Sequence, residues 1–74
     1  MIFKLDVAWD SRSNVILWSF VPQDHRAEGL LERLGFRDVF NRQAPLTFQG
    51  LAAVAAGRML RACGARFSDK EFHD

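Results

Sequence analysis

Few side chains in this 74-residue sequence have the types and spacing that catalysis needs. A nucleophile and a base could be drawn only from Cys63 and the two histidines, His25 and His73, and no neighbouring residue is placed to orient such a pair. Glu28 and Glu32 form the closest carboxylate pair with helical spacing, and we expect both to face solvent. No metal-ligand spacing or glycine-rich phosphate loop is present. The sequence therefore predicts a protein that is not an enzyme, with no catalytic, cofactor-binding or metal site.

The lone cysteine also bears on the compartment. A single Cys63 cannot form a disulfide within the chain, which favours a reducing compartment. The segment 1–10 lacks the continuous apolar run of a signal peptide, and Asp6 interrupts it. No apolar run in the sequence is long enough to span a membrane. We therefore expect a complete small cytoplasmic protein with a buried, inert thiol at Cys63.

Arginine supplies most of the positive charge, with eight Arg against two Lys and a formal net charge of +1. This balance gives no bulk attraction to nucleic acid. Arg58 and Arg61 stand three residues apart and share a flank of one predicted helix. Guanidinium groups bind both carboxylates and phosphates, so an acidic protein surface and a nucleic acid both remain possible partners.

The last predicted helix, over 48–63, has two faces that could each pack against something. At about 100° per residue, the larger apolar side chains gather on one side, which we expect to face the core. That side comprises Phe48, Leu51, Ala52, Ala55, Met59, Ala62 and Cys63. The opposite side carries Gly50, Ala53, Gly57 and Leu60. Glycine inside a helix costs about 0.5–1 kcal/mol relative to alanine, so the small side predicts close approach of another backbone, from this chain or from a partner.

Two strands precede the helices. Alternation over 2–9 predicts a half-buried strand, and 15–21 predicts a second strand that pairs with it in a hairpin. The second strand is apolar on both faces. One set comprises Ile16, Trp18 and Phe20, and the other comprises Val15, Leu17 and Val21. Either both faces are covered, or one of them is free to bind a partner.

The remaining segments complete the expected fold. Asp24 should cap a helix over 25–34 that ends at Gly35, and a short third strand is expected at 37–41. Thr47 is the expected N-cap of the last helix, Gly64 its stop, and a brief extended segment follows at 65–67. The prediction is one α+β domain over 1–74 in ββαβα order, with both helices packed on one face of the sheet.

These features together predict a non-catalytic protein-protein interaction module. The expected contact residues are Gly57, Arg58, Leu60, Arg61, Val15 and Leu17. In size and in its lack of motifs, the chain is similar to the small inhibitors that phages and mobile elements encode, including anti-CRISPR proteins, which implies steric occlusion of a larger complex. The alternatives are a nucleic-acid-associated regulator that uses Arg58 and Arg61, and a structural homodimer subunit. A surplus of apolar residues, 49% of the chain, supports some form of association.

Overall fold

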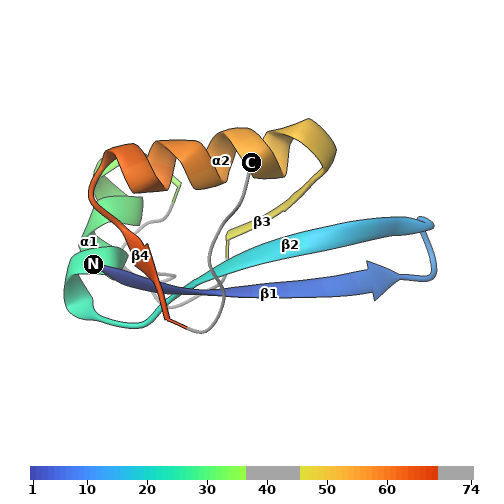
Figure 1. Ribbon diagram of the computed structural model, residues 1–74, viewed down its shortest axis with the longest axis horizontal. Helices are drawn as coiled ribbons and strands as arrows, with labels where there is room; N and C mark the ends of the chain where they lie inside the picture. Colours follow the sequence, from blue (N-terminus) through green and yellow to red (C-terminus); the bar gives the residue numbers. More distant parts are fainter. Residues whose placement is uncertain (37–45, 69–74) are drawn as a thin grey trace.

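The computed structural model describes residues 1–36 and 46–68, which form a four-stranded sheet and two helices (Figure 1). The elements are β1 (Ile2–Asp10), β2 (Val15–Pro22), α1 (His25–Arg33), β3 (Leu46–Gln49), α2 (Gly50–Ala62) and β4 (Arg66–Phe67). The strands lie in the order β3-β2-β1-β4. All neighbours are antiparallel except β4, which is parallel to β1. The predicted α+β class is confirmed, and β4 is the extended segment expected at 65–67.

The hairpin of β1 and β2 is closed by a turn at 11–14 whose residues donate hydrogen bonds to Asp10. The Asp10 carboxylate accepts from the Arg12 amide at 3.2 Å and from the Ser13 hydroxyl at 2.6 Å. Asn14 adopts the left-handed conformation that asparagine tolerates and donates its amide to the Asp10 carbonyl at 2.8 Å. This local network fixes a register in which Asp10 lies opposite Val15. The predicted hairpin is confirmed.

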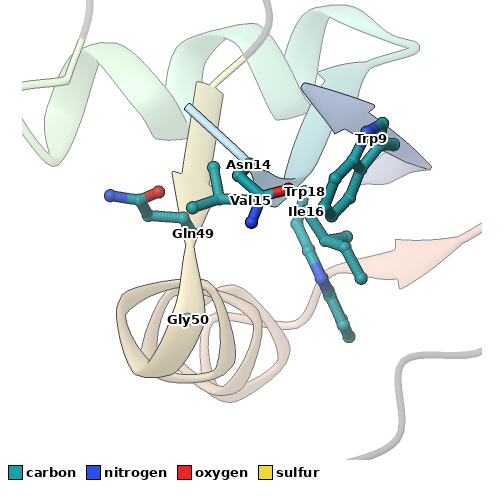
Figure 2. Close-up of a pocket in the computed structure, with 7 residues that line it drawn as sticks. All are labelled: Trp9, Asn14, Val15, Ile16, Trp18, Gln49 and Gly50. Atoms are coloured by element: carbon teal, nitrogen blue, oxygen red, sulfur yellow. The ribbon is translucent and has the colours of Figure 1, made fainter. Parts of the chain in front are cut away.

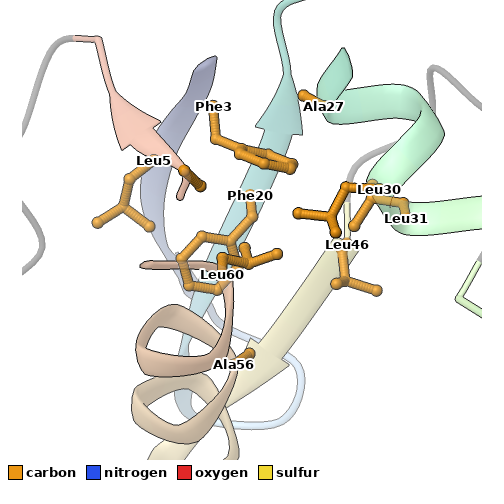
Figure 3. Close-up of a cluster of buried hydrophobic side chains, with 10 residues drawn as sticks. Phe3, Leu5, Phe20, Ala27, Leu30, Leu31, Leu46, Ala56 and Leu60 are labelled. Carbon is orange, nitrogen blue, oxygen red and sulfur yellow. The ribbon is translucent and has the colours of Figure 1, made fainter. Parts of the chain in front are cut away.

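The two faces of the sheet differ because the core lies on one of them. Directly opposed residues share a face, and Leu5 lies opposite Phe20, which lies opposite Leu46. These side chains belong to one buried cluster with residues of both helices (Figure 3). We call this side the covered face. The other side, the open face, carries Lys4, Asp6, Ala8, Val15, Leu17, Ser19, Val21, Thr47 and Gln49.

Helix α1 begins and ends as its sequence predicts. The Asp24 carboxylate accepts from the Ala27 amide at 2.8 Å, which satisfies one of the free donors at the helix start. At the other end Gly35 has a φ of 84°, and the Phe36 amide donates to the Leu31 carbonyl at 3.0 Å. This is the Schellman ending, and the same bond pattern closes α2 around Gly64.

The segment before α2 differs from its prediction. The strand expected at 37–41 lies outside the described residues, while Leu46–Gln49 forms β3 instead of the N-cap and first residues of the last helix. Thr47 is therefore a strand residue and not an N-cap, and its hydroxyl bonds to that of Ser19 at 3.0 Å. The chain reverses at Gly50, whose φ of 58° is readily reached by glycine. A conformational requirement of the turn therefore explains Gly50, and no close backbone is needed there.

Helix α2 packs with the opposite side to the one predicted. Its buried residues are Ala53, Ala56, Gly57 and Leu60. The side of the helix that was expected to face the core is mostly exposed to solvent. Leu51 is 86% exposed, and Ala52, Ala55, Ala62 and Cys63 are exposed as well. Of the two possibilities left open for the small side, packing within this chain is the one that the structure has, so Gly57 and Leu60 are core residues and not exposed contact residues. The prediction that Cys63 is buried was wrong.

The size of the side chains in the sheet accounts for this reversal. Phe20 lies fully buried on the central strand β2. Its ring centroid is 6.5 Å from that of Phe48 and 5.9 Å from that of Phe67. Aromatic rings already fill much of the layer between sheet and helix, so α2 fits best with its small residues inward. Leu60 is the large side chain that α2 adds to this layer, and it lies beside Phe20 in Figure 3.

The helices cover only part of the sheet. β1 has nine residues, roughly 30 Å at ~3.3 Å per residue, and the hairpin extends past the start of α2 (Figure 1). Phe3 and Leu5 are buried, but Val7 is 41% and Trp9 59% exposed although they point to the same face. The half-buried strand predicted over 2–9 is therefore buried on its apolar face only at the end near the helices.

The reversed packing of α2 predicts opposite outcomes for two leucines of one helix. Leu60→Ala removes a fully buried side chain and should cost about 2–5 kcal/mol. Leu51→Ala should change stability by no more than about 0.5 kcal/mol. Thermal unfolding measures both, and about 10 °C or more should separate the midpoints. If Leu51→Ala lost more stability than Leu60→Ala, the result would contradict this packing and support the core side that the sequence predicted.

Asp24 ties α1 to the first strand and makes part of the stability depend on pH. The Ala27 amide chiefly holds the pKa of the Asp24 carboxyl below its ordinary value of 3.8, with help from the N-terminal ammonium, the Ile2 amide and Arg26 and against the effect of desolvation. Because the pKa is lowered on folding, this stabilisation is present above about pH 4 and is lost as the pH falls through the folded pKa.

Asp24→Asn tests this electrostatic contribution, since asparagine also caps helices but carries no charge. The thermal midpoint of the wild type should exceed that of Asp24→Asn at pH 6, and the difference should shrink between about pH 4 and pH 2. Asp6→Asn, on the open face, is the matched control. A difference for Asp24→Asn that stays constant over the whole range would contradict the assignment.

Candidate functional site

The described residues do not assemble a catalytic set. Cys63 is exposed at the C-terminal end of α2, and no cluster of three potential metal ligands occurs within residues 1–36 and 46–68. His25 Nδ1 lies 3.1 Å from Glu28 Oε2 across one turn of α1. Glu28 is buried, so the prediction that it faces solvent was wrong. The imidazole is almost fully exposed, so the pair resembles an ordinary side-chain contact at a helix start.

A hollow lies where the hairpin extends past α2. It is open to solvent, with a volume of about 710 Å³, and its lining joins the hairpin end to the start of the helix (Figure 2). The lining residues are Trp9, Asn14, Val15, Ile16, Trp18, Gln49 and Gly50. Two indole rings and two branched aliphatic side chains make it mostly apolar. The described lining includes no charged side chain, and the two amides, Asn14 and Gln49, supply its polar groups.

Two large apolar residues of this hollow, Trp9 and Ile16, are more than half exposed. Ile16 is 51% exposed and lies opposite Trp9, which is itself 59% exposed. Large aromatic side chains are enriched among the residues that dominate protein interfaces. An open apolar patch on a small chain marks a surface that is normally covered by something else. We call Val7, Trp9, Ile16 and Trp18 the hairpin patch.

The structure separates the contact residues that the sequence predicted. Gly57 and Leu60 are buried and belong to internal packing, whereas Arg58 and Arg61 are exposed on α2. Val15 lines the hollow, and Leu17 is half-buried on the open face. No described helix covers that face.

Sequence reasoning missed the hairpin patch because it named Val15 and Leu17 as the contact residues of the second strand. One signal was present: a nine-residue alternating strand is longer than two short helices can cover in so small a chain.

Comparison with protein-family models, with curated proteins and with solved structures finds no match for this chain. Neither of the two described helices combines the length and apolar character required to cross a bilayer.

The exposed position of Cys63 reverses the expectation for this thiol. Ellman's reagent should modify it with one equivalent in the folded protein, at a rate comparable to that of a small free thiol. Cys63→Ser should shift the free energy of unfolding by no more than about 0.5 kcal/mol. A thiol that reacts only after denaturant is added would show that Cys63 is covered.

Proposed function

We propose that this chain is a non-catalytic protein-binding module that contacts its partner through the hairpin patch and the hollow beside it. The supporting observation is the exposure of Trp9 and Ile16 beyond the reach of the helices. On this face of the sheet, the apolar side chains continue beyond the helices that cover the rest of it. Such an exposed apolar surface resembles the core of a protein interface. The amides of Asn14 and Gln49 at the hollow correspond to the polar rim that interfaces place around such a core.

The shape and charge of the hollow favour a protein over other ligands. Sites for small molecules enclose most of the ligand surface, and this hollow is open. Nucleic acids require cations along the contact, and the described lining contributes none. An apolar segment of a partner protein, with a side chain inserted between the two indoles, matches both properties.

We propose that this module acts as an inhibitor by steric occlusion. A chain of 8.5 kDa that binds through one apolar patch can block a working surface of a larger complex without chemistry of its own. This mode requires only that the patch and the partner's working site overlap. The alternative, nucleic-acid binding through Arg58 and Arg61, stays a prediction, and its salt dependence distinguishes it.

Capture from a lysate of the cells that express the protein tests the proposal with two matched lysine variants. Ile16→Lys places a charge in the apolar hollow, and Ala8→Lys places the same charge at an exposed position on the open face. Ile16→Lys should reduce capture of the partner at least tenfold, about 1.4 kcal/mol, while Ala8→Lys should retain it.

Salt and nuclease then identify the class of partner. Capture through an apolar patch should survive about 0.5 M salt and nuclease treatment, whereas arginine contacts to phosphates weaken steeply. Capture that Ile16→Lys leaves unchanged would rule out the hollow as the contact surface. Capture that is lost with nuclease would favour Arg58 and Arg61 on nucleic acid.

A further inference from the structure

We draw no further inference here: the strongest candidate, the apolar groove of about 250 Å³ beside α2 that Phe36, Phe48 and Met59 help to line, carries no proposal because nothing in the described part of the chain shows what covers it.

Discussion

The fold depends on how the sheet accommodates its aromatic rings. Phe20, on the central strand β2, is fully buried and contacts Phe48 from β3 and Phe67 from β4. These contacts connect the two edge strands through the middle of the sheet. They also occupy the space above it, and the helix that closes this space must present small side chains. The orientation of α2 follows from that limit on volume.

The orientation of α2 in turn determines what the surface offers. Because Ala53, Ala56 and Gly57 face the sheet, Leu51 and Cys63 face outward, and the arginines at 58 and 61 lie on the exposed side of the helix. The helix also starts at Gly50, part of the way along the hairpin. The end of the sheet beyond it keeps its apolar side chains without a cover. The candidate binding surface is thus a consequence of a helix that is too short for its sheet.

The hollow beside Ile16 and Trp18 lies between the hairpin and the start of α2, and side chains make its surface. Trp9 joins this lining from β1, so both strands of the hairpin contribute to the candidate binding surface.

The sequence by itself determined the elements whose signals are local. The hairpin, the Asp24 cap and the stops at Gly35 and Gly64 depend on hydrogen bonds between residues a few positions apart, so their residue types predict them. Local signals also misled: Thr47 has the type of an N-cap, but β3 pairs it with Ser19, twenty-eight positions away. Only the tertiary structure decided which side of α2 faces inward. Periodicity finds the apolar side of a helix, whereas packing depends on the volume left by distant aromatic rings. The exposure of Trp9 and Ile16 was decided in the same way, because it depends on where a helix begins in space relative to the end of a strand.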